Sequence, residues 1–242
     1  MKILEKIKTK TENLMEEHIP CIAFLGDSVT QGCFELYEPV EGKPLETVCD
    51  FDNNYQNNLK KLLNMFYPNT PVALINAGIS GDNAVHGAKR IEKDVLRFNP
   101  DLVVVSFGLN DCHKGIEGVK EYSEALATIF KGIKDSGAEC IFMTENMMNT
   151  YVSDRIKNDF LKEIAQKTMA IENEGVLKEY FDAAKAVALE YDVAVCDVYS
   201  KWKQLEESGI DTTALLSNNI NHPVREIHQM FAYMLFETML SN

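Results

Sequence analysis

Five short apolar runs alternate with longer segments of helical periodicity, and this alternation constrains the fold more than any other feature of the chain. The runs cover residues 21–25, 72–75, 102–107, 140–144 and 193–196. Short continuous runs of this kind are typical of strands that are buried on both faces. Strands that alternate with helices are joined by parallel crossover connections. We therefore predict an α/β fold, a three-layer α/β/α domain with a parallel sheet of about five strands.

The segments between the runs carry apolar residues at helical spacing. The predicted helices cover 54–66, 84–98, 118–136, 155–191, 198–207 and 225–240. Gly175 lies inside the longest of these segments and is expected to divide it into two helices. An amphipathic helix is predicted at about 1–18, before Pro20. The segment 34–52 has no clear periodicity and is expected to be a long loop near the functional site.

Composition limits the classes of partner. The 242 residues contain no internal repeat or linker, so we expect a single domain over 1–242. A net charge of -13 argues against nucleic acid as a partner, because binding phosphate groups requires a basic face. No apolar run approaches the roughly 18 residues of a membrane-spanning helix, and the N-terminus lacks a secretion signal. The expectation is a cytoplasmic protein that does not bind membranes.

The six cysteines are scattered singly, with no CxxC pair and no nearby His at zinc-ligand spacing, and no set of His, Asp and Glu residues has the spacing of a metal site. We therefore expect free thiols, without disulfides, metal or any other cofactor.

Four short polar motifs contain the residues that could take part in catalysis. They are Gly-Asp-Ser at 26–28, Ser-Gly-Asp at 80–82, Gly-Leu-Asn-Asp at 108–111 and Asn-His-Pro at 221–223. The first three each follow a predicted strand. Because the carboxyl ends of parallel strands meet at one edge of a sheet, we expect these three motifs to line a common crevice.

In their order and spacing these motifs resemble the four blocks of the SGNH hydrolases, also called GDSL-like lipases and esterases. The matching segments are 26–30, 76–82, 108–111 and 222–223. The resemblance implies a flavodoxin-like fold, with Ser28 as nucleophile and His222 as general base. It also implies an oxyanion hole made by the backbone N–H groups of Ser28 and Gly81 and by the side-chain amide of Asn110. Glycine at position 81 keeps the approach to this hole unobstructed.

These roles suit the residues. A serine hydroxyl is a poor nucleophile until a base removes its proton, and imidazole titrates near neutral pH. The resemblance therefore implies a serine esterase whose partner is a small acyl ester, such as an acetylated carbohydrate. Two alternatives stay open: an acyltransferase or thioesterase that uses the same site, and a catalytically weak ligand-binding member of the fold. The oligomeric state stays open as well.

The residue that orients His222 departs from the family pattern. Most relatives have an aspartate three positions before the histidine, whereas this chain has Asn219. We favour a Ser-His dyad in which Asn219 or a backbone carbonyl accepts the imidazole N–H. The alternatives are a carboxylate from elsewhere, such as Asp211 or Glu226, or reduced activity.

Three further residues, in the motifs or directly after them, are candidates for the site. Asp27 and Asp111 are expected chiefly to bond nearby backbone N–H groups, and both remain candidates for substrate binding together with His113. His228, on the last predicted helix, is expected to pack near the site.

Overall fold

The computed structural model describes residues 1–39 and 45–242. Within them, five parallel strands form one sheet in the order β4-β1-β5-β6-β7. The strands are β1 (Cys21–Gly26), β4 (Ala73–Gly78), β5 (Leu102–Ser106), β6 (Glu139–Met143) and β7 (Ala194–Cys196). Every predicted apolar run overlaps one of these strands, so the predicted parallel sheet is confirmed.

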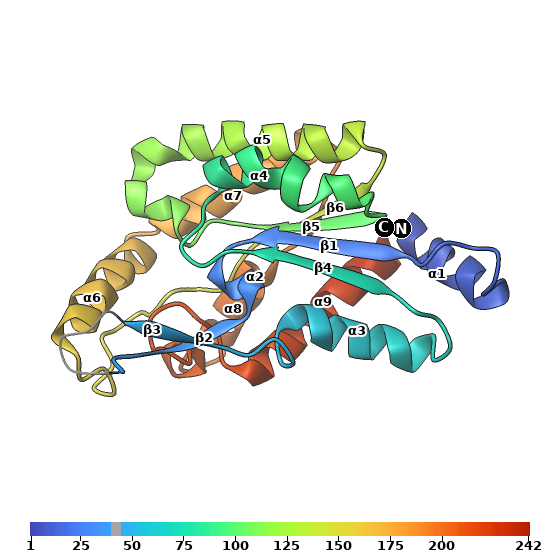
Figure 1. Ribbon diagram of the computed structural model, residues 1–242. Coiled ribbons are helices and arrows are strands. Elements are labelled where there is room, and N and C mark those ends of the chain that lie inside the picture. Colours follow the sequence, from blue (N-terminus) through green and yellow to red (C-terminus); the bar gives the residue numbers. More distant parts are fainter. Residues whose placement is uncertain (40–44) are drawn as a thin grey trace.

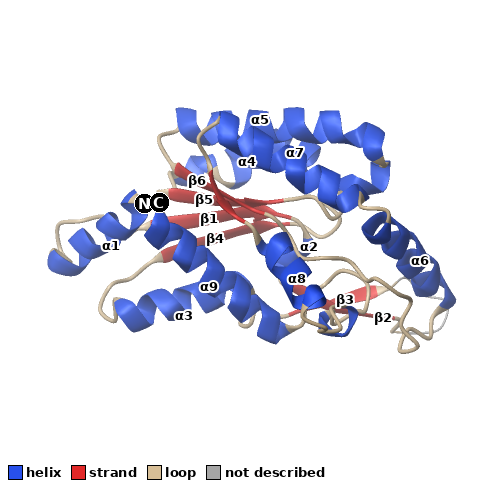
Figure 2. Cartoon of the chain, turned by 180° about the vertical axis from the view of Figure 1, so that it is seen from behind, coloured by secondary structure: helices blue, strands red, loops and turns tan. Residues whose placement is uncertain are grey.

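Helices cover both faces of the sheet and complete the predicted three layers (Figure 1). One face carries α4 (Ala84–Asp94), α5 (Val119–Asp135) and α7 (Val176–Glu190), and the other carries α3 (Tyr55–Phe66), α8 (Val198–Glu207) and α9 (Arg225–Ser241). Gly175 adopts a left-handed φ of 77° between α6 (Asp159–Asn173) and α7, which confirms the predicted division. The first helix, α1 (Lys2–Glu12), ends before the expected residue 18 and lies beside the C-terminal end of α9 (Figure 2).

The apolar runs form the core of the domain. All five residues of β5 are buried, because this strand has neighbours on both edges and helices on both faces. Each fully buried valine or leucine side chain contributes about 1.5–3 kcal/mol by leaving water. No helix in the described part of the chain is long and apolar enough to cross a membrane.

The segment 34–52 differs from the expected loop. Much of it belongs to an antiparallel hairpin of β2 (Cys33–Tyr37) and β3 (Glu46–Cys49), while residues 40–44 lie outside the described part. Arg225 at the start of α9 holds the hairpin, with an ion pair to Glu35 at 2.6 Å and another to Asp50 at 2.7 Å. These contacts come from a distant helix, so the local sequence pattern did not reveal the strands.

Candidate active site

The first three polar motifs converge at the carboxyl edge of the sheet, as predicted. The side-chain amide of Asn110, after β5, donates to Asp27 Oδ2 at 2.8 Å, after β1. The same amide donates to the backbone oxygen of Asp82, after β4, at 2.9 Å. One asparagine therefore joins the three loops.

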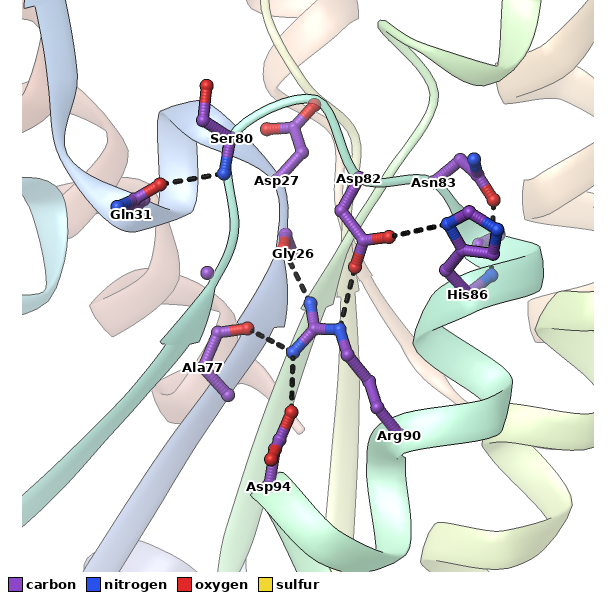
Figure 3. A network of polar contacts seen from close by, with 12 residues as sticks. Gly26, Asp27, Gln31, Ala77, Ser80, Asp82, Asn83, His86, Arg90 and Asp94 are labelled. Carbon is purple, nitrogen blue, oxygen red and sulfur yellow. Dashed lines mark hydrogen bonds and ion pairs between the residues drawn. The ribbon is translucent and has the colours of Figure 1, made fainter. Parts of the chain in front are cut away.

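Arg90 on α4 fixes the ends of two strands from below these loops (Figure 3). Its guanidinium donates to the backbone oxygens of Gly26 at 2.9 Å and Ala77 at 2.6 Å, and to Asp82 Oδ2 at 2.6 Å. No local motif distinguishes Arg90 from other arginines on helix surfaces, so its role could not be predicted from the sequence.

Ser28 is the first residue of the short helix α2 (Ser28–Gln31), which follows β1 directly. The preceding Asp27 caps this helix by accepting the Val29 N–H at 2.9 Å. Gly78 lets α2 pack directly on β4, since a Cβ atom at that position would lie 2.2 Å from the Gln31 nitrogen. Ser28 is therefore held in a buried turn at the edge of the sheet.

His222 approaches Ser28 from the C-terminal motif. Its Nε2 lies 3.0 Å from the Ser28 Oγ, and its Nδ1 lies 2.8 Å from the backbone oxygen of Phe34. A carbonyl only accepts, so Nδ1 carries the proton and Nε2 presents a lone pair to the serine hydroxyl. Burial lowers the pKa of His222 to about 4, which keeps the imidazole neutral and able to accept a proton at neutral pH.

The Nδ1 partner is thus a backbone carbonyl, and Asn219 does not occupy that position. Asn219 has a left-handed φ of 56°, and its N–H donates to the backbone oxygen of Leu216 at 3.0 Å. Neither of the two carboxylates named as substitutes, Asp211 and Glu226, is the Nδ1 partner within the described residues, and Asp211 instead accepts from the Tyr151 hydroxyl. The sequence carries no signal for the role of Phe34, because its backbone oxygen and not its side chain is the group involved.

The neighbouring Asn218 shapes the histidine loop. Its Oδ1 accepts the backbone N–H groups of Ile220 and Asn221 at 2.9 Å and that of His222 at 3.0 Å. This triple acceptor is buried and was not singled out in the sequence. It fixes the direction in which the His222 ring leaves the backbone.

Two of the three expected oxyanion donors are available. Within residues 1–39 and 45–242, neither the Ser28 N–H nor the Gly81 N–H has a hydrogen-bond acceptor. Gly81 has a φ of 76°, and a Cβ atom there would meet nothing within 4 Å. Glycine is therefore favoured at 81 by the backbone conformation rather than by a crowded neighbour.

Asn110, the third expected donor, already uses both amide hydrogens for Asp27 and Asp82. An oxyanion would have to share or replace one of these acceptors. The structure thus brings Asn110 to the site but leaves its amide engaged.

The three candidates for substrate binding, Asp27, Asp111 and His113, differ in their exposure. Asp27 is fully buried and accepts hydrogen bonds from Val29 and Asn110, and Asp111 is 4% exposed; contact of either carboxyl group with a substrate stays a prediction. Asp111 accepts the Ala84 N–H at 3.0 Å, the backbone role that was also anticipated. His113 is exposed in the turn after Asn110. His228 packs near the site, with its ring centroid 4.9 Å from that of Phe34.

Metal chemistry receives no support from side-chain clustering. Within the described residues, no three or more His, Cys, Asp or Glu side chains are grouped so as to hold a metal ion.

Comparisons with known structures agree with this architecture. The chain superimposes on the acetylxylan esterase Axe2 from Geobacillus stearothermophilus with a TM-score of 0.67 at 21% identity, covering 91% of this chain and 94% of that one. It superimposes on a gut microbial diltiazem-metabolizing enzyme with a TM-score of 0.68 at 19% identity, covering 91% of this chain and 47% of the other. At these identities the likeness shows the fold.

Sequence comparisons give the family. An acetylxylan esterase from Geobacillus stearothermophilus is 23% identical over 188 residues, covering 71% of this chain and 84% of that protein. An arylesterase from Vibrio mimicus is 36% identical over 72 residues, covering 30% of this chain and 36% of the arylesterase. The model of the GDSL-like Lipase/Acylhydrolase family matches residues 24–230. The chain therefore belongs to the GDSL-like lipase/acylhydrolase family, a family of carboxylic ester hydrolases.

Proposed function

We propose that the protein is a serine esterase that hydrolyses small acyl esters through an acyl-enzyme on Ser28. The observation that carries the proposal is the chain of contacts from Ser28 Oγ to His222 Nε2 at 3.0 Å and from His222 Nδ1 to the Phe34 oxygen at 2.8 Å. These contacts supply a nucleophile, a base in the required tautomer and a group that orients the base.

The reaction follows from these contacts. Nε2 of His222 takes the hydroxyl proton as Ser28 Oγ attacks the ester carbonyl, and the N–H groups of Ser28 and Gly81 stabilise the developing oxyanion. His222 then gives the proton to the departing alcohol. A water molecule repeats the attack on the acyl-enzyme, with His222 again as base, and releases the acid.

Short acyl groups, such as acetyl groups on carbohydrates, are the substrates we propose. Ser28 is 4% exposed, so a compact acyl group reaches it more readily than a long chain. The name of the acetylxylan esterase relative supports the same class of substrate.

A panel of p-nitrophenyl esters from acetate to octanoate, followed by acetylated sugars, tests the proposal. We expect the highest kcat/KM with acetate and covalent labelling of Ser28 by a fluorophosphonate probe. Ser28→Ala should abolish both. If the intact protein shows no turnover and no labelling, the esterase proposal is rejected. Acyl transfer to an added alcohol without release of acid would instead favour an acyltransferase.

A further inference from the structure

A second buried carboxyl group lies beneath the site. Glu145, two residues after β6, is fully buried, and its Oε2 accepts the backbone N–H of Leu109 at 2.9 Å. Its other oxygen, Oε1, receives no N–H from any described residue. The Glu145 carboxyl interacts with that of Asp27, which is also fully buried, so the two groups lie within hydrogen-bonding reach of each other. The two acids thus meet directly under the Asn110 loop.

Two touching carboxyl groups in a dry interior cannot both be ionised, so one of them holds a proton. Within the described residues, no lysine or arginine forms an ion pair with either acid. Asp27 uses both oxygens to accept N–H groups, from Val29 at 2.9 Å and from Asn110 at 2.8 Å. Glu145 has one oxygen without such a donor. The proton therefore belongs on Glu145, which donates it to Asp27.

We propose that Glu145 is a neutral positioning residue whose O–H holds Asp27 as the fixed acceptor of the Asn110 amide and of the α2 turn. The inference rests on the proposed esterase function and adds a residue that touches no substrate. Burial and the charge of Asp27 also raise the pKa of Glu145 well above its ordinary value, which agrees with a protonated Glu145.

Two substitutions test whether Glu145 acts as a neutral hydrogen-bond donor or as a charged carboxylate. In Glu145→Gln the amide still accepts the Leu109 N–H and donates to Asp27, so kcat, KM and the pH profile should stay close to wild type. Glu145→Leu has neither capacity, and kcat should fall about tenfold or more, with KM little changed, because the Asn110 loop loses its support. Loss of activity in Glu145→Gln equal to that in Glu145→Leu would overturn the proposal.

Infrared difference spectroscopy provides a readout that needs no activity. At pH 8, subtraction of Glu145→Gln from wild type should leave the carbonyl band of a protonated carboxylic acid. A carboxylate band in its place would overturn the proposal. If the protein hydrolyses no ester but the acid band is present, the esterase assignment fails while the protonation of Glu145 stands.

The hairpin carries an independent feature, a facing pair of cysteines. Cys33 on β2 lies directly opposite Cys49 on β3, and their Sγ atoms are 3.5 Å apart. Cys33 is buried, whereas Cys49 is exposed. Facing residues of antiparallel strands bring their Cβ atoms close to the separation that a disulfide requires.

We infer that Cys33 and Cys49 form a reversible disulfide by exchange with a low-molecular-weight disulfide. The exposed Cys49 thiolate attacks first, giving a mixed disulfide and one free small thiol. Deprotonated Cys33 then attacks the Cys49 sulfur and expels the second small thiol. Two protein thiols lose two electrons and two protons, and the small disulfide gains both. Burial raises the pKa of Cys33, which agrees with this order.

Intact-mass measurement after treatment with oxidised glutathione tests this step. Wild type should lose two hydrogens and carry no adduct, and Cys33→Ser should keep one glutathione on Cys49. Cys49→Ser should stay unmodified at Cys33. A stable glutathione adduct at Cys33 or Cys49 of the wild type, located by peptide mapping because Cys21 is also partly exposed, or two titratable thiols remaining at 33 and 49, would overturn the inference.

Discussion

His222 Nδ1 lies 2.8 Å from the backbone oxygen of Phe34, so a neutral carbonyl orients the imidazole that faces Ser28. A carbonyl fixes the tautomer but stabilises an imidazolium less than a carboxylate would. Burial lowers the pKa of His222 and the charge of Glu35 acts in the opposite direction, but that charge is balanced by the ion pair of Glu35 with Arg225. The base is therefore well placed and weakly supported electrostatically.

Removing the nucleophile is the first prediction. Ser28→Ala should lower kcat for p-nitrophenyl acetate by about 10³-fold or more, since no other hydroxyl replaces the attacking oxygen. The melting temperature should stay close to wild type. Residual activity near the wild-type level would show that the reaction occurs elsewhere on the chain.

Restoring the carboxylate typical of relatives should have little effect. In Asn219→Asp we expect no gain in kcat and an unaltered pH profile, because the Phe34 oxygen already occupies Nδ1. A clear rise in kcat would show that residue 219 reaches the imidazole.

The neighbouring Asn218 should matter more. Asn218→Ala leaves three backbone N–H groups without their acceptor, so we expect a loss of about 1–3 kcal/mol in the free energy of unfolding and a lower kcat. Urea unfolding and steady-state kinetics measure the two effects. Asn219→Gly, which tolerates the left-handed φ of 56° at that position, is the matched control, and equal losses in both variants would contradict the role given to Asn218.

The buried His222 predicts a dependence of stability on pH. Its folded pKa of about 4 lies below the ordinary value of 6.5, so between these values the unfolded chain binds more protons. The contribution of this group should be fully present above pH 6.5 and fall by up to about 3 kcal/mol as the pH drops to 4. The difference in unfolding free energy between wild type and His222→Gln isolates it, and a difference independent of pH would refute the shift.

Arg90 should behave as a positioning residue. Arg90→Lys cannot hold Gly26, Ala77 and Asp82 together, because an ammonium lacks the planar fork of the guanidinium. We expect kcat to fall about tenfold with a smaller change in KM. Arg97→Lys, on a residue that stacks on Phe98, serves as the control and should leave kcat unchanged.

The sheet and the positions of the first motifs at its edge were predictable, because both depend on the local sequence. The run that became β1 is apolar throughout, the run that became β5 is interrupted only by Ser106, and Ser28 and Asn110 follow those strands within a few residues. The fourth motif, around His222, followed from the family resemblance, and its ring does meet Ser28.

Other parts of the site depend on contacts between distant segments. Phe34 acts through a backbone atom that every residue type carries, and Glu145 is significant only because Leu109 and Asp27 lie against it. Similarly, the strands of the hairpin depend on Arg225 of α9. Such pairings appear only once the chain is folded.

The use of a Phe34 main-chain atom has a consequence for mutational scanning. Replacing the phenyl ring leaves the backbone acceptor in place. An alanine scan would therefore identify Ser28 and His222 but miss the backbone oxygen of Phe34. Only a change in the path of the strand, such as a shortened hairpin or a backbone ester, would expose it. A change in hairpin length would thus alter the orientation of the histidine without replacing any polar side chain.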